Sequence, residues 1–261
     1  MPESNQPFTP AVEYLRGASA ILDRVAATQL PAVQECGRLC GESILRGGLV
    51  HMFGSGHSRM ALEEMFPRYG SFPGFHPIVE LSVTYHNQVV GANGQRQAMH
   101  IERTEGLGPV ILRNFEFGPD DLMWVVSTSG AGALVVDVAL EAKERGMPVI
   151  ALVSVEHSRV CEPGHSSGKK LTDIADLVLD NCAVAGDAMV HVPGLQYPVG
   201  PGSTIGNTAI INAVKCEVAQ ILTEGGQPPY VLTHGHFIGA EASREVFELA
   251  YDDYRRRVRR L

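Results

Sequence analysis

Short apolar runs alternate with longer amphipathic runs along most of this chain. Five runs are short and rich in apolar residues, which predicts buried β-strands. They span residues 49–53, 77–81, 122–127, 149–154 and 177–179. Helix-like runs separate several of these strands. This alternation predicts an α/β fold with a parallel sheet and helices on both faces.

The longer runs predict helices and divide the chain into three parts. Helical spacing covers residues 11–28, 31–46, 133–145, 203–224 and 240–260, and a further helix follows the first strand as far as about Arg68. Two polar stretches, 84–103 and 157–169, interrupt the pattern and are expected to be loops with a function. We expect an N-terminal helical segment over 1–29, a central domain over 30–226 and a C-terminal helical extension over 227–261.

Composition and charge narrow the class of function. The 261 residues include 21 basic and 29 acidic side chains, a net charge of −8, which argues against nucleic-acid binding as the main activity. The basic run Arg255-Arg256-Arg257 with Arg259 and Arg260 fits a solvated final helical turn. No apolar run is long enough to span a membrane and residues 1–10 lack a secretory signal, so we expect a cytoplasmic protein that does not bind membranes.

Cysteines and histidines give no reason to expect a metal. The five cysteines are scattered without a C-x-x-C pair and fit reduced structural thiols. His234 and His236 alternate but lack a third ligand nearby, which is a poor zinc pattern. We therefore expect no metal and no cofactor.

A glycine-rich turn follows the first predicted strand and opens a helix. It contains Gly54, Ser55, Gly56, His57 and Ser58. Glycines let the backbone approach a ligand, and a helix N-terminus offers N–H groups to an anion. The turn has neither the third glycine of a dinucleotide fingerprint nor the G-K-[ST] ending of a P-loop, so nucleotide binding is disfavoured.

A hydroxyl-rich turn follows the third predicted strand and also opens a helix. Ser127, Thr128 and Ser129 precede Gly130, Ala131 and Gly132. Helix capping explains either turn alone. Two such turns at the carboxyl ends of parallel strands can face one crevice, and together they predict a binding site for phosphate or sugar oxygens.

These two turns resemble the paired signatures of the sugar isomerase (SIS) domain. The run Glu63-Glu64-Met65-Phe66-Pro67-Arg68-Tyr69 is similar to the stretch after the first loop of phosphoheptose isomerases. A branch of SIS-domain proteins is more closely similar, through His165-Ser166-Ser167-Gly168-Lys169, Asp180-Asn181-Cys182, Gly186-Asp187 and Gly200-Pro201-Gly202-Ser203-Thr204. The resemblance covers roughly residues 30–226 and implies a five-stranded, flavodoxin-like parallel sheet that binds a sugar phosphate.

One position departs from the wider family. Gly132 stands where SIS domains usually carry a last hydroxyl in the second turn, so one donor to a phosphate is missing. Backbone N–H groups can compensate, or the anionic group differs or binds elsewhere. Lys169 lies in a flexible basic loop that can supply the missing charge, although a solvated helix start is the favoured explanation for it.

The resemblance implies that Glu64 is the catalytic carboxylate, with Glu63 as the alternative register. An ion pair with Arg68 is the structural alternative for Glu64. His57, inside the first turn, and His86, in a polar segment, are candidates for proton transfer between sugar oxygens. Arg103 is a candidate for binding an anionic group. Surface solvation is expected for most members of the polar cluster that it forms with His100, Glu102 and Glu105.

The start of the last core helix completes the set of candidates. Ser203 and Thr204 follow Gly200-Pro201-Gly202 as a helix cap, and the resemblance places this helix start near the sugar. The leading hypothesis is an isomerase that interconverts an anionic aldose and ketose through an enediol without a cofactor. A sugar-phosphate-binding regulator and an amino-sugar-phosphate etherase or lyase remain open. The resemblance also implies a homo-oligomer, a dimer or tetramer.

Overall fold

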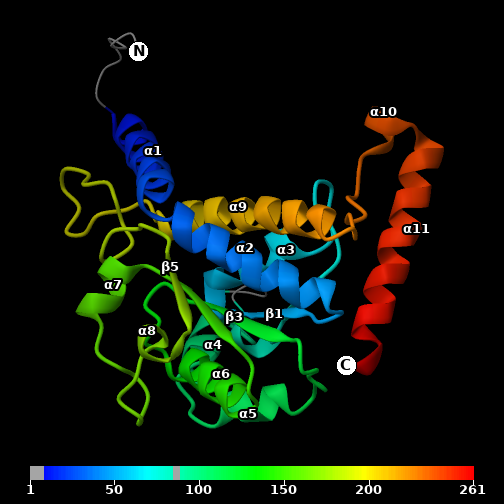
Figure 1. The fold of residues 1–261 in the computed structure, drawn as a ribbon. Helices are drawn as coiled ribbons and strands as arrows, with labels where there is room; N and C mark the ends of the chain where they lie inside the picture. Colours follow the sequence, from blue (N-terminus) through cyan, green and yellow to red (C-terminus); the bar gives the residue numbers. More distant parts are fainter. Residues whose placement is uncertain (1–8, 85–88) are drawn as a thin grey trace.

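A five-stranded parallel sheet lies at the centre of the protein (Figure 1). The structure, a computed structural model, describes residues 9–84 and 89–261. The strands run in the order β2-β1-β3-β4-β5, and every neighbouring pair is parallel. This confirms the predicted fold class. The strands are β1 (Val50–Phe53), β2 (Phe75–Ile78), β3 (Leu122–Val126), β4 (Val149–Val153) and β5 (Leu177–Asp180).

Helices cover both faces of the sheet. One face packs against α1 (Pro10–Thr28), α2 (Leu30–Leu45), α3 (Arg59–Met65) and α9 (Ser203–Glu224). The other face packs against α5 (Leu107–Leu112), α6 (Ala133–Glu144) and α8 (Leu171–Ile174). In the described parts of the chain, no helix is long and apolar enough to cross a membrane.

Alternation along the strands builds these two cores. Trp124 and Val126 of β3 join the cluster under α2 and α9, whereas Met123 and Val125 join the cluster under α5 and α6. Successive side chains of a strand point to opposite faces, so a strand buried on both sides must be apolar throughout. All five residues of β3 are buried, as the continuous apolar run predicts.

Two glycines let α2 lie close against α9. A Cβ atom on Gly37 would lie 2.4 Å from Cβ of Glu217, and one on Gly41 would lie 2.6 Å from Cγ2 of Ile221. Any larger residue at these positions would push the helices apart. The close packing fixes α9, whose first turn forms one wall of the cavity described below.

Smaller elements complete the chain. The short turns are η1 (Gly56–Ser58), η2 (Leu81–Val83) and η3 (Val258–Arg260), and the remaining helices are α4 (Gln95–Ile101), α7 (Val155–Val160), α10 (Gly235–Ile238) and α11 (Ala240–Arg257). In Figure 1, α10 and α11 stand apart from the sheet layers at the C-terminal end of the chain.

Three local predictions differ from the structure. β2 begins and ends earlier than the predicted 77–81, because Pro77 sits within an edge strand where a missing N–H is tolerated. α4 lies inside the stretch 84–103, whose polar sequence lacks an apolar helical stripe. α7 overlaps the start of the second predicted loop, and the buried Ser154 caps it by accepting from the His157 N–H.

A buried polar cluster lies at the amino edge of the sheet. The Asp121 carboxylate accepts from His51 Nε2 at 3.0 Å, from two backbone N–H groups and from Arg260. Burial raises the pKa of Asp121, but these hydrogen bonds outweigh it and lower the pKa to about 2. His51 Nδ1 lies 2.9 Å from His76 Nδ1, and burial lowers the pKa of His76 to about 4. Arg260 thus ties the end of the chain to the sheet.

Candidate functional site

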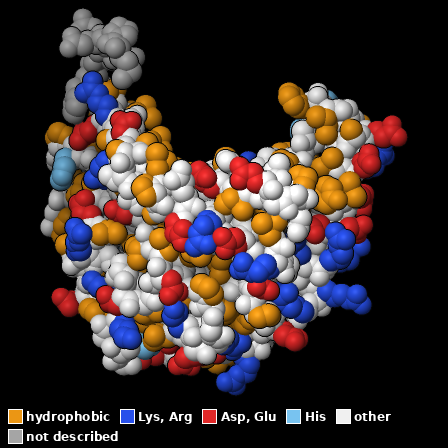
Figure 2. Space-filling model, viewed as in Figure 1, with side chains coloured by type: hydrophobic (Ala, Val, Ile, Leu, Met, Phe, Trp, Pro, Cys, Tyr) orange, Lys and Arg blue, Asp and Glu red, His pale blue; other side chains and the backbone are white. Residues whose placement is uncertain are grey.

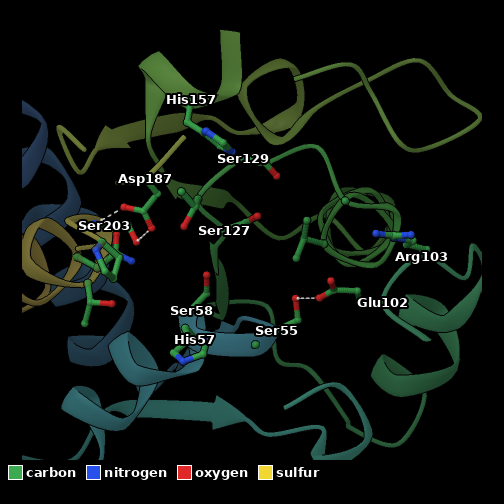
Figure 3. A pocket seen from close by; sticks show the side chains of 17 residues that line it. Ser55, His57, Ser58, Glu102, Arg103, Ser127, Ser129, His157, Asp187 and Ser203 are labelled. Atoms are coloured by element: carbon green, nitrogen blue, oxygen red, sulfur yellow. Dashed lines mark hydrogen bonds between the residues drawn. The ribbon is translucent and has the colours of Figure 1, made fainter. Parts of the chain in front are cut away.

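A cavity of about 460 Å³ opens at the carboxyl edge of the sheet (Figure 3). After β1 the chain crosses to β2 toward one edge of the sheet, and after β3 it crosses to β4 toward the other edge. The cavity therefore lies at the point where the strand order reverses, which is where open α/β sheets bind ligands. Its lining comes from the turns after β1 and β3, from the C-terminal end of α4, from α6 and α7, from the segment between β5 and α9, and from the start of α9. The lining residues are Ser55, Gly56, His57, Ser58, Glu102, Arg103, Ser127, Thr128, Ser129, Gly132, Val135, His157, Asp187, Pro201, Ser203, Thr204 and Asn207.

The first turn enters the cavity because its glycines allow a sharp reversal. Gly56 has a φ of +54°, in the region that favours glycine. Gly54 is buried below the turn, and a Cβ there would lie 3.1 Å from the carbonyl oxygen of Val126. Gly54 therefore shapes the turn without lining the cavity. In Figure 3 the Ser58 hydroxyl points toward the turn that carries Ser127.

The second turn presents hydroxyl groups whose oxygens are held by the backbone. Ser127 Oγ accepts from Gly130 N at 3.1 Å, and Ser129 Oγ accepts from Ala131 N at 3.2 Å. Within the residues that the structure describes, neither hydroxyl has an acceptor for its own hydrogen. Both can donate to a ligand in the cavity. Neutral donors of this kind suit the oxygens of a phosphate or a sugar.

Gly132 leaves open space at the start of α6. A Cβ atom there would meet only Cγ2 of Val135, at an ordinary contact distance of 3.8 Å. Gly132 is the N-cap of α6 and offers no side-chain hydrogen bond. The first N–H groups of α6 therefore lack the hydroxyl cap that serine or threonine would give.

Glu102 reaches the cavity from the end of α4. Its Oε2 accepts the Ser55 hydroxyl hydrogen at 2.9 Å, and its backbone carbonyl accepts from Leu134 N in the first turn of α6 at 3.1 Å. The second bond anchors Glu102 beside the serine turns. The sequence did not single out this residue, because the two contacts join segments far apart in the chain. Arg103 also lines the cavity, on the Glu102 side in Figure 3.

Asp187 occupies the N-terminus of α9. Its carboxylate accepts from Gly202 N at 3.0 Å, Ser203 N at 2.8 Å and Ser203 Oγ at 2.6 Å. A helix N-terminus favours a negative charge, and here the protein supplies that charge itself. Ser203 is therefore held by Asp187, while Thr204 and Asn207 face the cavity one turn along the helix.

His157 and Asp187 are cavity residues that the sequence predictions missed. His157 lies on α7 beyond β4, and its Nδ1 accepts from Gly186 N at 2.8 Å. Asp187 adopts a φ of +51°, which turns its carboxylate toward α9. The only sequence signal for either residue was its place after a strand or within the Gly186-Asp187 motif.

Glu64 lies outside the cavity lining of the described chain. Its Oε1 accepts from Arg68 at 2.6 Å, and its Oε2 lies 3.4 Å from Nδ2 of Asn212 on α9. Asn212 follows the cavity residue Asn207 by five positions, which is about 7.5 Å along a helix. Both the ion pair and the separation favour a structural role for Glu64 within one copy of the chain.

A buried lysine holds the backbone at Glu64. Lys215 Nζ donates to the Glu64 carbonyl oxygen at 2.6 Å and to Asn212 Oδ1 at 3.1 Å. Burial lowers the pKa of Lys215, and the nearby Glu64 carboxylate opposes that shift. These contacts fix the end of α3 on α9.

The remaining candidates are placed as follows. Ser55, Gly56, His57, Ser58, Arg103, Ser127, Thr128, Ser129, Ser203 and Thr204 meet in the cavity. Lys169 is exposed and does not belong to the described lining, whereas its neighbour Lys170 donates to the carbonyl oxygen of Ser158 at 2.7 Å. His86 lies outside the described residues.

Comparisons with known proteins agree with this architecture. The chain matches the family model of the SIS domain over residues 13–154. A UPF0309 protein of Thermoanaerobacter pseudethanolicus is 32% identical over 254 residues, covering 96% of this chain and 99% of that protein. A UPF0309 protein of Geobacillus kaustophilus is 34% identical over 229 residues, covering 88% of this chain and 89% of that protein.

Solved structures show the same fold. A phosphoheptose isomerase from Neisseria gonorrhoeae is similar with a TM-score of 0.50 and 15% identity, covering 82% of this chain and 97% of that one. A phosphoheptose isomerase from Francisella tularensis is similar with a TM-score of 0.50 and 17% identity, covering 80% of this chain and 96% of that one. At these identities the likeness shows the fold alone.

Proposed function

Because this chain belongs to the SIS domain family, we propose that its cavity binds an anionic, phosphorylated sugar and that the protein interconverts the aldose and ketose forms of that sugar. One observation carries the proposal. Two serine-bearing turns and the carboxylate of Glu102 line the same cavity, and the second turn has two hydroxyl hydrogens to donate. Hydroxyl donors suit the anionic group, and a carboxylate suits proton transfer at carbon.

The anionic group binds at the second turn in this proposal. Ser127 and Ser129 donate hydroxyl hydrogens, and the N-terminus of α6 adds the positive end of its dipole. Arg103 lies in the same lining and adds a positive charge. The N-terminus of α9 is a weaker candidate for the phosphate, because the Asp187 carboxylate already occupies it.

Glu102 is the better placed base among the carboxylates of the cavity. Asp187 accepts three hydrogen bonds from the start of α9, so its carboxylate is engaged in holding that helix. Glu102 lies at the opposite end of the cavity, with its carboxylate oriented by Ser55 (Figure 3). The resemblance to phosphoheptose isomerases favours Glu64 instead, and the two hypotheses make opposite predictions for single substitutions.

The chemistry moves two protons, one between carbons and one between oxygens, and requires no redox step. The carboxylate takes the proton from C2 of the open-chain aldose, the C–H electron pair forms the C1=C2 bond, and the carbonyl pair moves to O1. The proton on O2 then passes to O1 as the carbonyl forms at C2. The carboxylic acid returns its proton to C1, which completes the ketose and restores the base.

Isotope exchange tests the proposed function. Pentose, hexose and heptose phosphates are incubated with the protein in deuterated water, and deuterium at C2 of the aldose is followed by NMR. Loss of both hydroxyls in the Ser127→Ala/Ser129→Ala variant is expected to weaken sugar-phosphate binding at least about tenfold. Ser82→Ala is the control, because its hydroxyl bonds Glu80 rather than lining the cavity.

The alternatives are separable outcomes of the same experiment. Tight binding without exchange in any sugar favours a regulatory sugar-phosphate-binding protein. Exchange accompanied by loss of a C3 substituent favours an etherase or lyase. Failure of every sugar phosphate to bind contradicts the proposed function itself.

We also propose that the protein is a homo-oligomer. Leu15 and Leu22 on α1 are 63% and 46% exposed, and Phe237 on α10 is 86% exposed. Figure 2 shows the molecule hollowed between α1 and the α10–α11 arm, with hydrophobic side chains on both sides of the hollow. Apolar side chains gathered in this way favour association. Light scattering that gives the mass of a single chain at micromolar concentration would contradict it.

A further inference from the structure

His157 presents one defined nitrogen to the cavity. Its Nδ1 accepts the Gly186 N–H at 2.8 Å, and it lines the cavity together with Ser129 and Asp187 (Figure 3). A neutral imidazole that accepts at Nδ1 carries its hydrogen on Nε2. The ring therefore offers an Nε2–H donor. If Nδ1 instead carried the hydrogen and donated it to a backbone carbonyl, Nε2 would be an unprotonated acceptor.

The segment that sets this tautomer is itself fixed. Ser154 Oγ donates to the Ala183 carbonyl at 2.7 Å, and Glu156 Oε1 accepts from Ala185 N at 3.0 Å. Gly186 has a φ of +82°, so its N–H turns toward α7. Successive bonds thus join the start of α7 to residues 183–186, and the Gly186–His157 bond belongs to this rigid set.

The position of His157 complements that of Glu102. His157 projects from α7 beyond β4, while Glu102 comes from α4 on the other side of the serine turns. A small sugar between the two can present a C–H to the carboxylate and an oxygen to the imidazole. An isomerase needs both, because the negative charge formed when the carbon loses its proton collects on the carbonyl oxygen.

We infer that His157 is a catalytic residue that donates a hydrogen bond from Nε2 to the carbonyl oxygen of the open-chain sugar. This inference rests on the proposed function. As the carboxylate removes the C2 proton and the C1=C2 bond forms, O1 gains the carbonyl electron pair and the Nε2–H hydrogen bond strengthens. The hydrogen stays on Nε2, so the imidazole remains neutral while O2–H supplies the proton that O1 finally takes.

Two substitutions separate the two nitrogens. His157→Asn keeps an acceptor near the Nδ1 position for Gly186 N–H but removes the donor, and it should lower kcat at least about 100-fold with little change in sugar binding. His157→Gln places an amide donor near the Nε2 position and should recover part of that loss. Arg159→Ala, on the exposed side of α7, should leave kcat unchanged.

A measurement without turnover tests the hydrogen bond directly. Erythrose 4-phosphate is an aldose that cannot close into a furanose ring, so the band of its C1 carbonyl can be followed by infrared spectroscopy when it is bound. We expect the band to shift to lower frequency in the wild-type protein and to return toward the solution value in His157→Asn. ¹⁵N NMR of the histidines should find the neutral His157 ring protonated at Nε2.

The outcomes distinguish this inference from the proposed function. A shifted band that His157→Asn reverses, without isotope exchange in any sugar, contradicts the isomerase but supports the hydrogen bond. Exchange that His157→Asn leaves unchanged overturns the role of His157 and leaves the isomerase intact. A ring protonated at Nδ1 overturns the inference whatever the protein binds.

Discussion

Ser55 donates its hydroxyl hydrogen to the Glu102 carboxylate at 2.9 Å, although 47 residues separate them in the chain. The bond joins the turn after β1 to the end of α4. It gives the cavity a carboxylate beside the serine turns and fixes one of its oxygens. The proposed base therefore depends on a neighbour that belongs to the proposed binding turn.

Removal of the Ser55 hydroxyl should impair catalysis more than folding. In Ser55→Ala, Glu102 loses an orienting hydrogen bond, and we expect kcat/KM to fall about tenfold to 100-fold. Thermal unfolding should change by only a few degrees, since the bond is partly exposed. Ser55→Thr, which keeps the hydroxyl, should recover part of the activity. Steady-state kinetics that match the wild type in Ser55→Ala would contradict the orienting role.

The open space at Gly132 predicts a gain of binding. Gly132→Ser places a hydroxyl at the start of α6 without a clash, and inorganic phosphate should bind several-fold more tightly by calorimetry. Gly130→Ser is the matched control in the same turn. Gly130 has a φ of +63°, and a Cβ would lie 3.1 Å from Cγ1 of Val153, so this variant should lose about 1–3 kcal/mol of stability. Unchanged phosphate affinity in Gly132→Ser would place the anion elsewhere.

Local sequence patterns predicted the sheet and both serine turns, because these depend on neighbours in the chain. β3 and β4 are buried on both faces, so their apolar runs are unambiguous. Gly54 to Ser58 and Ser127 to Ser129 lie directly after strands, which places them at the carboxyl edge. β2 lies at the edge of the sheet, where a proline is tolerated. Pro77 weakened the apolar pattern of this strand, so the predicted bounds of 77–81 were shifted.

Tertiary contacts explain what the sequence left out of the cavity. Glu102 was not singled out from its polar cluster because its partner Ser55 is distant in the chain, and no spacing rule joins them. Asp187 reaches α9 through a left-handed backbone conformation that its residue type does not require. His157 is one of ten histidines, and only the fold brings its ring to Gly186 N–H.

Stability should fall in mild acid because of His76. Its pKa is about 4 in the folded protein and about 6.5 when unfolded, so between these values the unfolded chain binds a proton that the folded chain does not. The stability that the neutral His76 ring contributes is complete above pH 6.5 and is lost as the pH falls toward 4. Urea unfolding should give about 2 kcal/mol less stability at pH 5 than at pH 7 from this group. His76→Gln should flatten that dependence, and an equally steep slope in the variant would assign it to other groups.

The end of the chain should contribute to global stability. Arg260→Met leaves the buried Asp121 carboxylate without its guanidinium partner, and we expect a loss of about 1–3 kcal/mol in urea unfolding. Arg259→Met is the control, because Arg259 is exposed one residue earlier. Equal stability of the two variants would show that the Arg260–Asp121 contact contributes nothing.

The identity of the base is tested most directly by comparing Glu102→Gln with Glu64→Gln in the isotope-exchange experiment. Both substitutions keep the size of the side chain and most of its hydrogen bonding but remove its basicity. If Glu102 takes the C2 proton, Glu102→Gln should reduce deuterium incorporation at least about 100-fold while sugar binding survives, and Glu64→Gln should exchange at nearly the wild-type rate. Loss of exchange in Glu64→Gln with wild-type exchange in Glu102→Gln would contradict the account and assign the base to Glu64.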